Sequence, residues 1–65
     1  MSRTLTTNEM DILRFAEMHG EYTCVGVVMV LAARKLAFEG RVTMVSDEAD
    51  NDGIGRCKVG HKAAS

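Results

Sequence analysis

The first hydrophobic pattern along the chain has the period of an α-helix and predicts a helix from Thr7 to about His19. Its apolar side chains fall on one arc of a helical wheel and most of its polar side chains on the opposite arc. Thr6 and Glu9 have the spacing of a capping box, in which each side chain satisfies a backbone N–H of the other residue. Gly20 follows as the expected stop signal, so we expect an amphipathic surface helix with defined ends.

The second pattern, over residues 24–39, is a long apolar segment that we also expect to form a helix, which begins either at Cys24 or several residues later. Its first half is rich in Val, which favours a strand, whereas its second half favours a helix. Sixteen residues exceed the length of a usual strand, and Gly40 supplies a stop signal, although Gly26 is a weak point. Because a short chain can hardly bury a helix that is apolar all round, we expect part of it to face a second copy or a partner.

The last third of the chain alternates with a period of two and predicts a β-hairpin with strands at residues 41–46 and 54–59. The connection, residues 47–53, is polar and ends in Asp-Gly, which is a turn signal. These elements predict one α+β domain over residues 1–65, with two α-helices packed on a two-stranded antiparallel β-hairpin. The expected core consists of Leu5, Ile12, Leu13, Phe15, Val28, Leu31, Leu36, Val42, Met44, Cys57 and Val59.

Composition and charge narrow the possible functions. Of the 65 residues, 46% are hydrophobic and 26% are charged, which is typical of globular proteins. The net charge is −1, whereas DNA-binding domains usually carry a basic excess, so direct DNA binding is the less expected function. We find no catalytic motif and expect neither enzymatic activity nor a cofactor. No apolar run is long enough to span a bilayer and no signal peptide is evident, so we expect a cytoplasmic protein with reduced thiols.

The most distinctive polar feature is a cluster of four carboxylates in the predicted hairpin connection, formed by Asp47, Glu48, Asp50 and Asp52. One interpretation is a solvated hairpin tip. The other is an anionic surface that imitates DNA, whose duplex carries about one charge per ~1.7 Å, and that is attracted to a basic groove. The cluster partly matches the start of a calcium-binding loop, but Val59 stands where a bidentate Glu is required, so we predict no metal site.

Basic residues provide an alternative candidate site. Arg56 and Lys58 share one face of the second predicted strand, and Arg41 begins the first. These side chains either protect the strand edges from aggregation or contact phosphates as a nucleic-acid-binding wing. The neighbouring acidic cluster would oppose the approach of DNA, which favours the first interpretation.

Two segments resemble winged-helix DNA-binding domains. Residues 5–13 (L-T-x-x-E-x-x-I-L) are similar to the opening helix of that family, and residues 38–42 (F-E-G-R-V) are similar to the end of its last helix leading into the wing. The resemblance implies a small regulator that binds DNA through the three basic residues named above. The chain departs from the family in residues 21–39, where a single apolar helix replaces two helices with a polar recognition face.

The chain as a whole also resembles the small phage-encoded anti-CRISPR proteins that act on type I systems, type I-C in particular. The likeness rests on a short chain, the capped first helix, the apolar second helix and the D-E-A-D-N-D-G connection. Several members of that group are acidic and occupy the DNA-binding surface of the surveillance complex, although the near-neutral charge of this chain departs from the most acidic members.

This second resemblance implies a function and a set of partners. The chain would be a non-enzymatic inhibitor that binds a bacterial type I CRISPR (Cascade-like) surveillance complex, a host ribonucleoprotein, and blocks its binding of target DNA. The carboxylates of Asp47, Glu48, Asp50 and Asp52 would make the contacts. We further expect a monomer or weak homodimer in the cytoplasm of a bacterial host, without membrane association.

Overall fold

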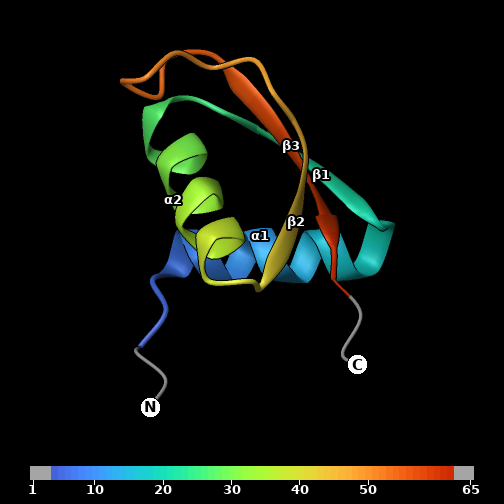
Figure 1. Cartoon of the computed structure of the whole chain (residues 1–65). Helices are drawn as coiled ribbons and strands as arrows, with labels where there is room; N and C mark the ends of the chain where they lie inside the picture. Colours follow the sequence, from blue (N-terminus) through green and yellow to red (C-terminus); the bar gives the residue numbers. More distant parts are fainter. Residues whose placement is uncertain (1–3, 63–65) are drawn as a thin grey trace.

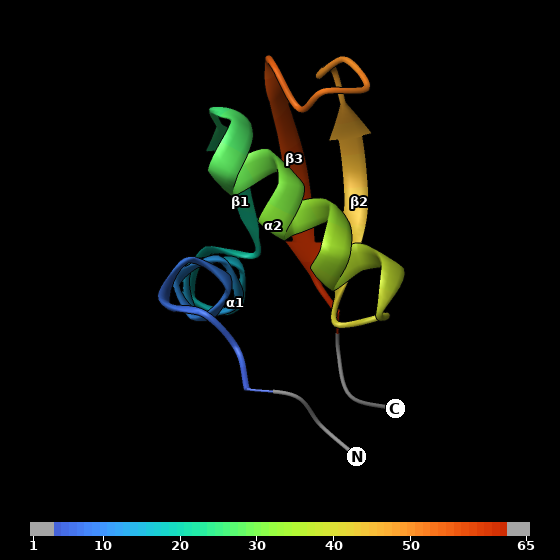
Figure 2. The ribbon, with the colours of Figure 1, turned by 90° about the vertical axis from the view of Figure 1, so that its left-hand side faces the viewer.

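The computed structural model describes residues 4–62, whose elements are α1 (Thr7–His19), β1 (Glu21–Val25), α2 (Val27–Phe38), β2 (Val42–Asp47) and β3 (Arg56–His61) (Figure 1). The three strands form an antiparallel sheet in the order β1-β3-β2. Both helices lie on one face of this sheet (Figure 2). The α+β class is confirmed, but the sheet has three strands rather than the predicted two. Within the described residues, no helix is long and apolar enough to cross a membrane.

Helix α1 has the ends that the sequence predicts. The Thr6 side chain accepts a hydrogen bond from the backbone N–H of Glu9 at 3.2 Å, and the Glu9 carboxylate accepts one from the N–H of Thr6 at 2.9 Å. The capping box is therefore complete, and it accounts for the burial of Glu9, whose carboxylate satisfies a backbone donor. Gly20 ends the helix with a φ of 84°, a conformation that L-residues rarely adopt.

The second helix begins at the later of its two expected starts, and a strand that the sequence did not predict precedes it. Cys24 and Val25 belong to strand β1, and α2 begins only at Val27. Gly26 separates the two elements with a φ of 96°, and its N–H donates a hydrogen bond to the carbonyl of Gly55 at 3.2 Å. Only Cys24 and Val25 of the Val-rich half are extended, because they pair with β3, whereas the valines from Val27 onward are helical.

The core lies between the helices and the inner face of the sheet. Fully or almost fully buried apolar side chains are Ile12, Ala16, Cys24, Val30, Ala33, Leu36, Val42, Cys57 and Val59. Two expected core residues are wrong, because Val28 is 64% exposed and Leu31 is 46% exposed. The buried stripe of α2 passes through Val30, Ala33 and Leu36, and Val28 and Leu31 fall on the opposite side of the helix.

Strands β2 and β3 form the predicted hairpin with later ends than expected. Val42 faces the helices, as predicted, and is 3% exposed. An irregularity between Met44 and Ser46 shifts the register, so that Asp47 lies opposite Cys57. Because Cys57 points toward the helices, this bulge turns Asp47 to the same side of the sheet.

Candidate functional site

The acidic loop, residues 47–53, lies at the end of the sheet where α2 begins (Figure 1). Its backbone is fixed to the next strand. The N–H of Glu48 donates to the carbonyl of Arg56 at 2.9 Å, and the N–H of Asp50 donates to the carbonyl of Ile54 at 3.0 Å. The loop is therefore a hydrogen-bonded extension of the hairpin with a defined shape.

Asp47 is bound by α2 and is the carboxylate most constrained in the loop. Its two oxygens accept hydrogen bonds from Nε and Nη2 of Arg34 at 2.9 and 3.0 Å, a bidentate arrangement. Arg34 Nη2 also donates to the carbonyl of Ala49 at 3.1 Å, and the N–H of Ala49 donates back to Asp47 at 3.1 Å. The hydrogen bonds from Arg34, and then the one from Ala49, hold the pKa of Asp47 below its usual range.

Asp50 organises the rest of the loop. Its Oδ1 accepts hydrogen bonds from the backbone N–H groups of Asp52 and Ile54, both at 2.9 Å. Gly55 has a φ of 132°, and a Cβ added there would lie 2.8 Å from the Cα of Ala49. The tight approach of the two backbone segments thus requires a glycine, and the carboxylate of Asp50 satisfies the donors of the turn.

The other two predicted contact residues point into solvent. The Glu48 carboxylate lies 3.7 Å from Arg56, and both side chains are almost two-thirds exposed, so this ion pair contributes little. Asp52 is exposed, and its carboxylate makes no hydrogen bond or ion pair with any described residue. The four predicted residues therefore divide into two that build the loop and two that are available to a partner.

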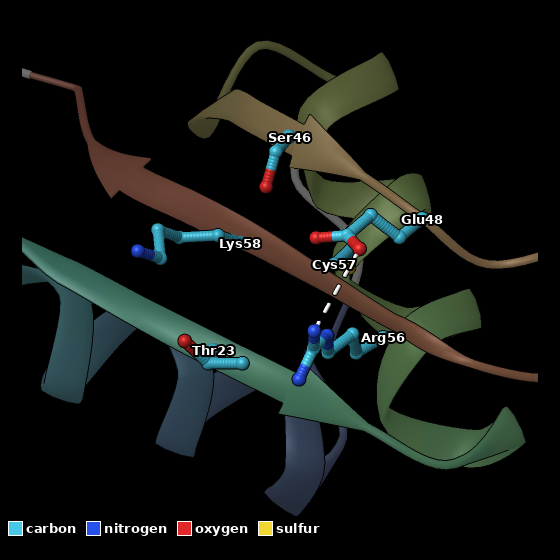
Figure 3. A pocket seen from close by; sticks show the side chains of 6 residues that line it. All are labelled: Thr23, Ser46, Glu48, Arg56, Cys57 and Lys58. Carbon is cyan, nitrogen blue, oxygen red and sulfur yellow. Dashed lines mark ion pairs between the residues drawn. The ribbon is translucent and has the colours of Figure 1, made fainter.

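The alternative site is only partly assembled. Arg56 and Lys58 lie side by side on the uncovered face of β3, next to Thr23 and Ser46, around a shallow hollow of about 230 Å³ (Figure 3). Arg41 lies at the opposite end of β2, where its Nε donates to Glu39 at 3.1 Å. The structure does not bring the three predicted phosphate contacts together.

The two cysteines are neighbours on the helix-covered face of the sheet. Cys24 and Cys57 are directly opposite in the β1–β3 register and are 0% and 1% exposed. Burial, reinforced by the neighbouring Cys57 thiol, raises the pKa of Cys24 to about 12, and burial also raises the pKa of Cys57. Among the described residues, no group of three or more His, Cys, Asp or Glu side chains could hold a metal ion.

The outward side of α2 forms a third surface, which the sequence prediction had assigned to the core. A groove of about 310 Å³ runs between this side and the start of α1. It is lined by Thr6, Asn8, Glu9, Val28, Leu31, Ala32 and Lys35. Only a binding partner could bury the apolar side chains on this side of α2, as the apolar character of the segment suggested.

These surfaces differ in what they can bind. Outward carboxylates accept charge-assisted hydrogen bonds from Lys and Arg, whereas the ammonium and guanidinium groups of β3 attract anions, and the outward side of α2 can bury apolar side chains of a partner.

Comparisons with protein-family models, with curated proteins and with solved structures found no match for this chain.

Proposed function

We propose that this chain is a non-enzymatic inhibitor that binds a nucleic-acid-processing complex of a bacterial host and blocks its binding of target DNA. The main support for this proposal is the acidic loop. Its Glu48 and Asp52 side chains point outward, and Asp47 and Asp50 fix its backbone. The resemblance to anti-CRISPR proteins suggests a type I CRISPR surveillance complex as the target, with the loop entering a groove lined by Lys and Arg.

The rigidity of the loop supports this proposal. A flexible acidic tip would lose conformational freedom on binding, and that entropic cost would reduce its affinity. Here the hydrogen bonds of Arg34 and Asp50 already order the loop backbone. The outward carboxylates can therefore bind a basic groove with a smaller loss of conformational entropy. The negative charges of these carboxylates also speed association with a positively charged surface.

The exposed side of α2 argues against the alternative, a DNA-binding regulator. A helix that reads base edges needs polar side chains on its outward side. Val28 and Leu31 occupy that side of α2, and Phe38 at its end is 92% exposed. The feature that favours the alternative is the pair Arg56 and Lys58 on the open face of the sheet (Figure 3). Two cations beside Glu48 make a weak phosphate-binding surface.

A gel-shift experiment with double-stranded target DNA tests the proposal. A purified type I surveillance complex is incubated with the protein before the DNA is added, and the protein alone is run with DNA in parallel. We expect the wild-type protein to abolish the shift caused by the complex. The variant carrying Glu48→Gln and Asp52→Asn should inhibit at least about tenfold less well, because each lost charge-assisted contact contributes roughly 1.5–3 kcal/mol.

The matched control carries Asp11→Asn and Glu17→Gln, which remove the same two charges from α1, away from the loop. Full inhibition by the loop variant, or equal loss in the control, would contradict a loop-mediated mechanism. A shift produced by the protein alone, falling steeply as salt increases, would support the DNA-binding alternative. Asp47 and Asp50 are left unchanged, because replacing them would alter the shape of the loop.

A further inference from the structure

The side of α2 that points away from the sheet is an apolar surface that the described elements leave largely exposed. We call it the α2 outer face, formed by Val27, Val28, Leu31, Lys35 and Phe38. Exposed fractions of its apolar side chains range from 42% at Val27 to 92% at Phe38. Four of its residues, at positions 28, 31, 35 and 38, follow the alternating spacing of three and four that seals pairs of packed helices.

We propose that two copies of this chain associate through the α2 outer face, with the two α2 helices antiparallel about a two-fold axis. In this arrangement Phe38 of one copy covers Val28 of the other, and Leu31 meets the aliphatic stem of the second copy's Lys35. A parallel arrangement would place Lys35 against Lys35 and leave Val28 without the aromatic ring. The face is therefore complementary to itself only in the antiparallel orientation.

The charges at the two ends of α2 favour the same orientation. The acidic loop lies beside the N-terminal end of the helix, where Gly53 approaches Leu31 and Val27. Arg41 follows the C-terminal end, and Lys62 lies close by, with its Nζ 3.6 Å from a Cβ built on Gly40. An antiparallel pair sets the basic end of one copy beside the acidic end of the other, and the attraction between these opposite charges favours this orientation.

The size of the surface sets the strength of the association. The 12 residues of α2 span about 18 Å, and each partner in a standard stable complex buries about 800 Å². Phe38 can supply roughly 150–250 Å² of that area, and Ile54, which is 61% exposed beside the helix start, extends the surface. Because the helix contact alone is small, we expect a reversible dimer that dissociates at micromolar concentrations.

Sedimentation velocity over a range of protein concentrations tests this proposal. Val28→Asp and Phe38→Lys each place a charge where the helix dipole favours it, so each variant should keep its helical circular dichroism. Each single variant should weaken the dimer, so that it dissociates at a concentration at least tenfold higher than that at which the wild-type dimer dissociates. Combining the two changes in one chain should restore association, because the new carboxylate of one copy then faces the new ammonium group of the other.

The matched control is Met18→Lys, which replaces another apolar side chain, 66% exposed and in the last turn of α1. It should leave the dimer unchanged. A wild-type protein that stays monomeric at the highest concentration would overturn the proposal, as would a dimer that Met18→Lys weakens and Phe38→Lys does not. Failure of the combined variant to recover would overturn the antiparallel arrangement. None of these variants alters the acidic loop, so the result is independent of the proposed inhibition.

Discussion

The inner face of the sheet and the acidic loop are stabilised by different kinds of contact. Between the inner face and the helices, Cys24, Leu36 and Val59 are fully buried in one cluster of apolar side chains. In the loop, hydrogen bonds to Asp47 and Asp50 determine the path of an exposed backbone. Burial is non-directional and supports the whole domain, whereas the loop contacts are directional and local. Changes in the first region should unfold the chain, and changes in the second should alter its local order.

Leu36→Ala in the inner region should have the largest effect. The side chain is 0% exposed on the stripe of α2 that faces the sheet, and removing it leaves a cavity. Such substitutions cost about 2–5 kcal/mol, and a domain of this size has a total stability of only about 3–10 kcal/mol. Urea denaturation followed by circular dichroism should therefore show a greatly lowered midpoint.

Phe38→Ala is the control for that experiment, because the same helix carries Phe38 at 92% exposure. We expect it to change the unfolding free energy of the monomer by less than about 0.5 kcal/mol. If the two alanine variants were equally unstable, the helix would not be oriented as described.

The sequence predicted elements whose signals are local and missed the one that depends on a distant partner. Helix α1 carries its own capping box, so its ends could be predicted to the residue. Strand β1 has no turn of its own before α2, and only Gly26 separates them. Its extended form depends on pairing with β3, more than thirty residues later, and no local pattern reveals that pairing.

The same distinction applies to the candidate site. Clustering in the sequence located the acidic loop correctly between two strands. It could not show that Asp47 is bound by Arg34, because thirteen residues separate them and the sheet bulge decides which way Asp47 points. It also placed Arg41 with Arg56 on one surface, although they lie at opposite ends of the hairpin. The sequence showed which residues are charged, but only the tertiary fold shows which residues they contact.

Alkaline pH should destabilise the inner region, and Cys24→Ala isolates this effect. The folded pKa of Cys24, about 12, lies above the ordinary thiol value of about 8.5. Its contribution is therefore fully present below the unfolded pKa and is lost as pH rises toward the folded value. The Cys24 thiol alone lowers the unfolding free energy by up to about 1.4 kcal/mol per pH unit in that range. Urea midpoints between about pH 8 and pH 10 should fall less steeply in the variant, and equal slopes would contradict a buried, protonated Cys24.

Asp47→Asn in the loop should have the smallest and most local effect, with the opposite dependence on pH. The pKa of Asp47 is lowered by Arg34, so its contribution is present above the ordinary value of about 4 and is lost as pH falls through the folded pKa. At neutral pH the variant should exchange the Ala49 amide hydrogen faster, while the urea midpoint changes little. The difference in exchange between the variant and the wild type should shrink as the pH falls through the folded pKa of Asp47 and its carboxylate is protonated. Asp52→Asn should leave this amide unaffected, because the Asp52 carboxylate makes no hydrogen bond or ion pair with any described residue. An equal effect of both substitutions would show that overall charge, rather than the Arg34–Asp47 contact, orders the loop.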